Sequence, residues 1–323
     1  MYAPWCFLGI FIAASLLMIW RLEAMNADGF EGTVLGTLIM PYCSGIGNLI
    51  FALLLARNHG PGAEVMTNGL VNNVTNLTLL IGVPAILWPT KATNSNRGGK
   101  GKSKKAAGGA AKPDIHRFSM LLTLLAVLFF TGAVWALGQD GKISFDDGLV
   151  LVGLFLFWQC FHVFEVLKTK ASEGKTFNWF TALNLLLLGV GAYASYVTID
   201  WLVSWLNTRP SGFISKENLG WMSGWMMVLP NAILALYYGW RRKLEVVYTS
   251  QVGDGHICIP LCIGLYALFH PMTLPPIFMT GVYLLAGATA AHLLFIGTMG
   301  KLPRLAGFAL VAAYGYFLKI GLK

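Results

Sequence analysis

Ten apolar stretches, each long enough to form a helix that crosses a lipid bilayer, dominate this sequence. A spanning helix needs about 20 apolar residues, and none of the stretches alternates with the period of two that a membrane β-barrel requires. Only 11% of the residues are charged, whereas soluble proteins carry roughly 25%. We therefore predict an all-α polytopic membrane protein with about ten transmembrane helices. The stretches are residues 3–20, 33–56, 65–88, 118–138, 148–167, 178–206, 218–240, 246–269, 275–297 and 303–321.

The basic residues indicate how these helices are oriented. Loops that join an odd-numbered span to the following even-numbered one carry seventeen of the 23 Lys and Arg residues. Positively charged loops stay in the cytoplasm, so we expect both termini outside and the segment 90–117 inside. No Lys or Arg precedes the first stretch, which is therefore predicted to be a retained span rather than a cleaved signal peptide. The short loops and the lack of sorting signals favour a bacterial inner (plasma) membrane.

Residues 90–117 form a segment rich in Gly, Ala and Lys with no apolar periodicity, a composition typical of disorder. Its charge suits acidic lipid heads or nucleic acid. The simpler interpretation is a solvated loop that sets topology, and no nucleic-acid partner is expected. This loop separates residues 1–89, with spans 1–3, from residues 118–170, with spans 4 and 5. Residues 171–323 carry spans 6–10.

The second and third spans are similar to the seventh and eighth. In each pair a Pro-containing segment (36–58 and 225–243) precedes a polar one (66–82 and 249–264). Five spans separate the pairs, and because five is odd, the second copy must lie upside down relative to the first. This predicts two inverted five-helix repeats, and such repeats with interrupted helices are typical of secondary transporters. The expected helix breaks are Pro41, Pro230, Gly253 and Gly255.

Span 3 is unusually polar. Asn68, Asn72, Asn73 and Asn76 follow one another at helical spacings of three or four residues, so they share one broad helix face. Buried amides need partners. Facing helices can supply them through hydrogen bonds, and so can a bound ion; both interpretations remain open at this stage.

Span 8 carries Asp254 between two glycines, and Asp254 is the only carboxylate in either repeated motif. An acid inside a membrane helix is costly when charged and therefore indicates a functional site. His256 follows two residues later, on another face if the helix is regular. Because histidine titrates near neutral pH, His256 is a candidate proton sensor.

These motifs resemble those of the cation/calcium antiporter superfamily, which includes the sodium/calcium exchangers. Met40-Pro41-Tyr42 and Leu229-Pro230-Asn231 stand where that family has L-P-E. The segments 67–82 and 249–264 stand where it has G-N-x-x-G-S-N-x-x-N and a closing glycine. The resemblance implies two inverted halves that form one cation site from spans 2, 3, 7 and 8. It also implies that spans 1 and 6 move against this core to alternate access.

The sequence departs from the family at the two glutamates that bind calcium, where it has Tyr42 and Asn231. Calcium prefers six to eight oxygens, several of them charged. The site predicted here offers a single negative charge and suits a monovalent cation or a proton better. Tyr42 is expected to shape or gate the cavity. The predicted cation ligands are Asp254, Asn231, Asn68, Asn72, Asn73 and Asn76.

Two further acids lie near span ends. Glu165 is a candidate proton relay at the cytoplasmic end of span 5, although a side chain that reaches water from a helix end explains it as well. Asp200 in span 6 is either a gating residue or a solvated end residue. No metal besides the transported ion and no cofactor are expected. The sequence has no P-loop, G-x-S-x-G or H-E-x-x-H motif, so an enzyme is not expected.

The predicted function is secondary cation transport, with the bilayer, the cation and coupled protons as partners. An alternative of a different class is a structural or accessory subunit of a membrane complex that keeps the fold without transport. Loss of both motif glutamates agrees with that alternative, and the basic loop would then dock a partner protein.

Overall fold

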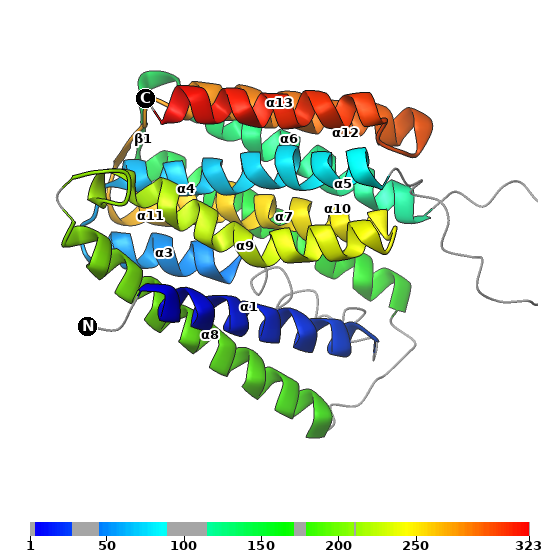
Figure 1. Ribbon diagram of the computed structural model, residues 1–323, viewed down its shortest axis with the longest axis horizontal. Coiled ribbons are helices and arrows are strands. Elements are labelled where there is room, and N and C mark those ends of the chain that lie inside the picture. The colour runs from blue at the N-terminus through cyan, green and yellow to red at the C-terminus, as the bar shows by residue number, and fades with distance from the viewer. Residues whose placement is uncertain (1–3, 28–44, 89–114, 171–178, 210, 323) are drawn as a thin grey trace, which may run out of the picture.

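The apolar stretches form long helices that run side by side (Figure 1). This computed structural model describes residues 4–27, 45–88, 115–170, 179–209 and 211–322. In chain order the helices are α1 (Pro4–Ala27), α3 (Ile46–Arg57), α4 (Gly62–Val74), η2 (Thr75–Leu80), α5 (Ile81–Leu87), α6 (Ile115–Leu137), η3 (Gly138–Asp140), α7 (Phe145–Lys170), α8 (Trp179–Asn207), η4 (Lys216–Asn218), α9 (Leu219–Trp240), α10 (Leu244–Ile257), η5 (Cys258–Cys262), α11 (Ile263–Phe269), α12 (Phe278–Met299) and α13 (Arg304–Gly321).

Eight helical segments of the described residues are long and apolar enough to cross a membrane. The shorter helices α3, with 12 residues, and α13, with 18, account for the other two predicted stretches. Large apolar side chains on the outer faces remain exposed, among them Phe157, Trp179 and Leu305. Such a surface suits lipid rather than water. The prediction of an all-α polytopic membrane protein is confirmed.

The inverted repeat shows most clearly in the third helix of each half. In the first half α4, η2 and α5 form one continuous helix with a π-helical segment, and α10, η5 and α11 do the same in the second half. The same sequence spacing separates Leu80 from Cys262, the last residues of the two π segments, and Gly82 from Gly264. The two irregularities are therefore equivalent positions of the repeat, and π segments of this kind often lie at functional sites.

The two halves exchange their last helices. Helix α13 packs on α5, where a Cβ atom at Gly307 would lie 2.9 Å from the carbonyl oxygen of Gly82. Helix α7 packs on α11 in the same way, because a Cβ atom at Gly148 would lie 2.9 Å from the carbonyl oxygen of Gly264. Only glycine permits these approaches without displacing the neighbouring backbone. Each half thus covers the central helix of the other.

A short antiparallel pair of strands joins two loops at one end of the bundle. Strand β1 (Lys142–Ile143) precedes α7, and β2 (Met272–Thr273) precedes α12; Lys142 pairs with Thr273, and Ile143 with Met272. Ile143 and Met272 are fully buried. The start of α1 and the end of α13 lie at this same end of the molecule (Figure 1).

Helices α1 and α8 form a separate pair along one side of the bundle (Figure 1). They have a small apolar cluster of their own, made of Met18, Leu22, Met25 and Leu188. A second, much larger core runs through the other helices and also includes Phe11 of α1 and Ile199, Val203 and Leu206 of α8. The small cluster joins α1 to α8; that spans 1 and 6 move as a unit against the core stays a prediction.

The expected helix breaks need correction. Pro230 lies inside α9, which continues to Trp240. Gly253 and Gly255 lie inside α10, which continues to Ile257; the irregular turn comes after them, at the π segment that contains Pro260. Proline frees a carbonyl four residues earlier without necessarily ending a helix, and Gly255 permits close packing instead. Pro41 lies outside the described residues.

Candidate functional site

The polar face of α4 and η2 is completely buried. Asn68, Asn72, Asn73 and Asn76 are each at most 2% exposed. All four amides must therefore find partners inside the protein. The partner of each amide shows which of them lie together near Asp254.

Asp254 on α10 lies at the centre of this polar region and is 1% exposed. Its Oδ2 atom accepts a hydrogen bond of 2.6 Å from Nδ2 of Asn231 on α9. The same oxygen accepts a second bond of 3.3 Å from Nδ2 of Asn76 on η2. Asp254 lies on the third helix of the second half. It therefore contacts both the second helix of its own half and the third helix of the first half.

The network continues through α4 to α3. Asn76 Nδ2 also lies 2.9 Å from Oδ1 of Asn72, and Asn72 Nδ2 donates to Oδ1 of Asn48 at 3.4 Å. Asn48 belongs to α3 and is 3% exposed. Spans 2, 3, 7 and 8 thus share one network, and Asp254 is its single carboxylate among the described residues.

Asn68 points elsewhere. Its Nδ2 donates to Oγ of Ser223 on α9 at 3.0 Å and lies 3.4 Å from the sulfur of Met227. These contacts are those of a helix–helix hydrogen bond. Of the two interpretations of the asparagine face, helix–helix hydrogen bonding therefore fits Asn68. It fits the asparagines nearer to Asp254 less well.

Four buried side-chain oxygens on α4, η2 and α10 accept no hydrogen bond from any described residue. They are Asp254 Oδ1, Asn73 Oδ1, Asn76 Oδ1 and Gln251 Oε1. The amide nitrogens of the same side chains all donate, with Asn73 Nδ2 bonded to the carbonyl of Gly69 at 2.7 Å. Only hydrogen-bond acceptors remain without a partner among these side chains. They therefore lack hydrogen-bond donors or a positively charged group.

Asn73 reaches this region because residue 255 is glycine. A Cβ atom on Gly255 would lie 3.1 Å from Oδ1 of Asn73 and 3.0 Å from a side-chain methyl of Val127. The absent side chain lets the Asn73 oxygen lie against the backbone of α10. Gly255 therefore supports the site through close packing between the two repeats.

Two residues of this region, Asn48 and Gln251, are not among the ligands predicted from the sequence. Asn48 lies in the apolar stretch that forms α3, and its only signal was a lone amide in a membrane helix. Gln251 precedes Asp254 by three residues on α10 and is fully buried. It stands at a variable position of the family motif, which drew no attention to it, although the spacing of three predicts a shared helix face.

His256 is brought to a different place. Its Nε2 atom lies 3.1 Å from the carbonyl oxygen of Thr123 on α6, and because a carbonyl only accepts, that nitrogen donates. Its ring packs against Phe130 and Trp158, with centroids 6.0 and 5.5 Å apart. His256 and Asp254 point to different neighbours, as the spacing on a regular helix predicted.

The other candidates lie outside the network. Asp200 is partly exposed on α8, which contributes no side chain to the network described above. Helix α7 includes position 165, but the side chain of Glu165 is outside the described part of the structure. Tyr42 also lies outside the described residues. A gating or relay role for these three residues remains a hypothesis.

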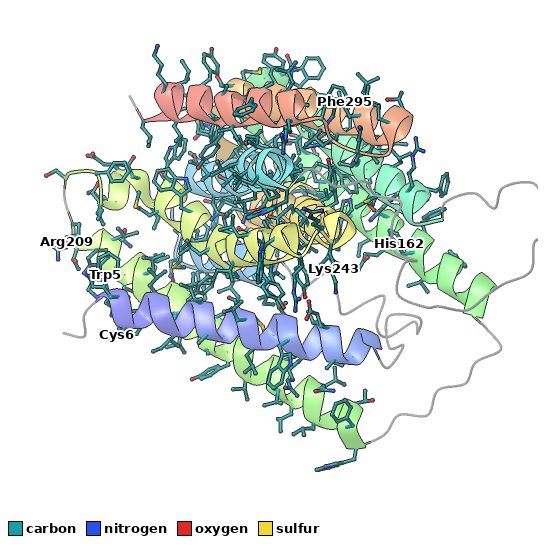
Figure 2. All side chains as sticks on the ribbon, turned by 45° about the vertical axis from the view of Figure 1, so that its right-hand side comes forward. Trp5, Cys6, His162, Arg209, Lys243 and Phe295 are labelled. Atoms are coloured by element: carbon teal, nitrogen blue, oxygen red, sulfur yellow. The ribbon has the colours of Figure 1, made fainter. Side chains whose placement is uncertain are left out.

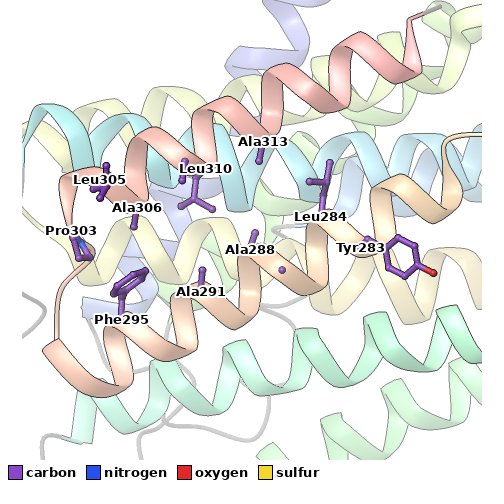
Figure 3. Close-up of a pocket in the computed structure, with 12 residues that line it drawn as sticks. Tyr283, Leu284, Ala288, Ala291, Phe295, Pro303, Leu305, Ala306, Leu310 and Ala313 are labelled. Atoms are coloured by element: carbon purple, nitrogen blue, oxygen red, sulfur yellow. The ribbon is translucent and has the colours of Figure 1, made fainter.

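No group of three or more His, Cys, Asp and Glu side chains suited to a metal ion occurs in the described ranges. The oxygen-rich region around Asp254 is different, because it is built from carboxamides and one carboxylate. A cavity of about 640 Å³ between α12 and α13 is lined by apolar side chains such as Tyr283, Ala291, Phe295 and Leu310 (Figure 3). Its lining carries one polar side-chain group, the hydroxyl of Tyr283, and no charged side chain.

Comparison with known proteins agrees with the fold. A sequence profile for the family described as "Sodium/calcium exchanger protein" matches residues 4–164. No curated protein sequence matches the chain.

Solved structures of the sodium-calcium exchanger NCX_Mj have a similar fold. The form soaked with 2.5 mM Na⁺ and 10 mM Sr²⁺ has a TM-score of 0.65 and 18% identity, over 98% of this chain and 99% of that one. The form soaked with 10 mM Na⁺ and 10 mM Sr²⁺ has a TM-score of 0.66 and 18% identity, over 98% and 96%. The form with zero Na⁺ and Ca²⁺ has a TM-score of 0.60 and 18% identity, over 96% and 98%. The fold is therefore shared along nearly the whole of both chains.

Proposed function

We propose that this chain, which belongs to the cation/calcium antiporter superfamily, is a secondary transporter that moves a monovalent or proton-coupled cation by alternating access. One observation supports this proposal above the others. Asp254 is buried between the two repeats, and its Oδ2 holds two amide donors while its Oδ1 has none among the described residues. An oxygen of this kind, deep in a membrane protein, is suited to a proton or a metal cation.

The charge of the site favours a monovalent cation over calcium. Calcium sites in proteins use several carboxylates, and here Asn231 replaces one glutamate of the family motif while Tyr42 replaces the other. The amide of Asn231 is a donor to Asp254 and leaves the carboxylate as the one negative charge of the network. One positive charge neutralises such a site. A neutral ion pair has a lower free-energy cost of burial inside a membrane than a pair with net charge.

Alternating access would use the pair formed by α1 and α8. The apolar cluster of Met18, Leu22, Met25 and Leu188 joins the two helices, which supports motion of the pair as one unit. Rigid-body movement of one bundle around a fixed site is the usual mechanism of transporters with inverted repeats.

We also propose that both termini face the outside of a bacterial inner membrane, with residues 90–117 in the cytoplasm. Arg209, Trp5 and Cys6 lie at one end of the bundle, and His162 and Lys243 at the other (Figure 2). Cys6 is exposed. In intact cells a membrane-impermeant maleimide should therefore label Cys6 when Cys43 and Cys160 are replaced by serine. It should not label Lys243→Cys when Cys6, Cys43 and Cys160 are all replaced by serine; the reverse pattern would invert the orientation.

Transport is tested in liposomes that contain the purified protein. We expect a gradient of Na⁺, K⁺, Li⁺ or H⁺ to drive flux of a second cation, and Asp254→Asn to abolish it. Asp140→Asn is the matched control, because Asp140 is exposed and lies outside the network. Flux that survives Asp254→Asn would remove Asp254 from the mechanism. Flux of no tested cation, together with a stoichiometric co-purifying protein, would favour the structural-subunit alternative.

A further inference from the structure

Gln251 is a completely buried glutamine in a membrane helix, and only half of its amide is used. Its Nε2 donates to Oγ of Ser250 at 2.8 Å and lies 3.3 Å from the backbone carbonyl oxygen of Asn231. Its Oε1 accepts no hydrogen bond from the described residues. A buried carbonyl of this kind needs an explanation.

The orientation of this amide is fixed by its neighbours. A flipped amide would place Oε1 against the carbonyl oxygen of Asn231, and two acceptors repel each other. The nitrogen therefore belongs on the side of Asn231. The oxygen is left to the remaining surroundings of α10, which carries Asp254 one turn further along.

A proton alone does not satisfy this region. Protonation of Asp254 would supply one donor, at Oδ1. At least two of the three carboxamide oxygens of Asn73, Asn76 and Gln251 would still lack a donor, and carboxamides gain no proton of their own near neutral pH. A metal cation binds several oxygens at once, so it can satisfy more than one of these unpartnered acceptors.

We propose that Gln251 is a ligand of the transported ion. In this arrangement Oε1 of Gln251, with the side-chain oxygens of Asp254, Asn73 and Asn76, binds one dehydrated alkali-metal cation. The inference rests on the proposed transport function and narrows its substrate from any cation or proton to a monovalent metal ion. One carboxylate and one such ion cancel in charge, whereas a divalent ion would leave one positive charge buried in the membrane core.

Gln251 then also determines the valence of the cargo. Replacing its carboxamide by a carboxylate of the same shape adds a second negative charge to the same oxygen cluster. Two carboxylates among carboxamide oxygens come closer to what a calcium-sized divalent ion prefers. The neutral amide at position 251 is therefore as important as the charge at position 254.

The test is equilibrium binding of Na⁺, Li⁺, K⁺ and Ca²⁺ to the purified full-length protein in detergent, measured by isothermal titration calorimetry. We expect Gln251→Leu to weaken binding of the preferred alkali ion by about 10- to 100-fold, the effect of losing one contact to a charged group. We expect Gln251→Glu to raise the affinity for Ca²⁺ by about tenfold or more while affinity for the alkali ion does not rise in step.

Gln159→Leu is the matched control. Gln159 is also a buried glutamine, 4% exposed on α7, but the atom it leaves without a partner is the donor Nε2. Its replacement should leave the alkali-ion affinity within about twofold, since a donor has no attraction for a cation.

The possible outcomes distinguish the proposed role of Gln251 from the proposed transport function. Unchanged alkali-ion affinity in Gln251→Leu, with binding lost in Asp254→Asn, would overturn the role of Gln251 and leave the transport proposal intact. Proton-coupled binding with no alkali ion bound by the wild type would overturn the inference in favour of a proton alone. Absence of any cation binding or flux in the wild type would overturn both. Gln251→Glu is isosteric, so its change in selectivity is a readout that misfolding does not mimic.

Discussion

Asn231 of α9 donates a hydrogen bond of 2.6 Å to the carboxylate of Asp254 on α10, at the position where the related family carries a glutamate. The pair links two neighbouring helices of the second repeat. It also sets the charge of the site, because an amide here stabilises the carboxylate next to it, whereas an acid would compete with it for protons and cations.

Asn231→Asp should therefore change what the protein binds. Two carboxylates this close do not both stay charged unless a proton or a divalent cation lies between them. We expect the affinity for Ca²⁺ or Sr²⁺ to rise by about tenfold or more, measured by calorimetry on the purified protein.

Asn184→Asp provides the control for this change. Asn184 is also a buried asparagine, 0% exposed against 8% for Asn231, but it lies on α8 near Arg21. An acid there should leave divalent-ion affinity unchanged. Equal effects of the two substitutions would mean that any added buried charge has this result and that position 231 is not special.

A second relationship ties α12 to the π segment of the first half. Nε2 of His292 lies 2.8 Å from the carbonyl oxygen of Leu77 in η2, and the hydroxyl of Tyr248 on α10 lies 3.0 Å from Nδ1. The carbonyl can only accept, so Nε2 carries the hydrogen and Nδ1 accepts from the tyrosine. One side chain thus holds together α12, η2 and α10.

His292→Phe and Tyr248→Phe should each destabilise the protein by about 1–3 kcal/mol, because each leaves a buried polar group without its partner. The double variant should lose less than the sum, since the residues share one network. Thermal unfolding in detergent measures all three. Tyr283→Phe, on the exposed face of α12, should leave Tm unchanged. Strictly additive losses would show that the two residues act independently.

The sequence predicted this architecture well because the strongest signal of a membrane helix is its apolar length. Each of the ten stretches corresponds to a helical segment of the described residues, and the odd number of spans between the motifs predicted the inversion. The buried face of span 3 also followed from the spacing of its asparagines. These features depend on periodicity, which a sequence carries directly.

Other features depend on how helices are rotated and packed, which periodicity does not contain. The π segments arise where an extra residue enters a turn, and Thr75–Leu80 has no composition that marks it as such. Gln251 joins the site only because α10 faces Asn231, and Asn68 turns away to Ser223 because α9 packs there. Glycine was interpreted as a helix break, while at Gly255 it permits close contact.

The exchange of last helices between the halves predicts two equivalent sites of tight packing. Gly307→Ala and Gly148→Ala place a Cβ atom 2.9 Å from a backbone oxygen that has no room to withdraw. Overpacking of this kind costs about 1–3 kcal/mol, so both variants should lower Tm by similar amounts.

Each variant has a control on its own helix. Gly315 on α13 and Gly153 on α7 have no neighbouring atom within 4 Å of a Cβ at their positions. Alanine at these positions should be neutral or stabilise the helix by up to about 1 kcal/mol. A loss of Tm in the controls equal to that in the packed positions would contradict the exchange of helices as the source of the effect.

Motion of α1 and α8 as one unit can be tested by cross-linking. The rings of Phe7 and Trp201 stack with centroids 3.9 Å apart, which joins α1 to α8. The hydroxyl of Tyr238 on α9 donates to Glu23, which joins α1 to the core. If α1 and α8 move together against the core, a cross-link between α1 and α8 is tolerated during the transport cycle. A cross-link between α1 and α9 is not.

We therefore expect a bifunctional thiol reagent to leave cation flux intact in a Phe7→Cys and Trp201→Cys double variant. The same reagent should abolish flux in a Glu23→Cys and Tyr238→Cys double variant, with flux restored when a reducible linker is cleaved. Both pairs are made in a background with Cys6, Cys43 and Cys160 replaced by serine, and each single variant is the control for its pair. Loss of flux on linking α1 to α8 would mean that these two helices slide past each other during transport, and undiminished flux on linking α1 to α9 would mean that α1 belongs to the stationary core.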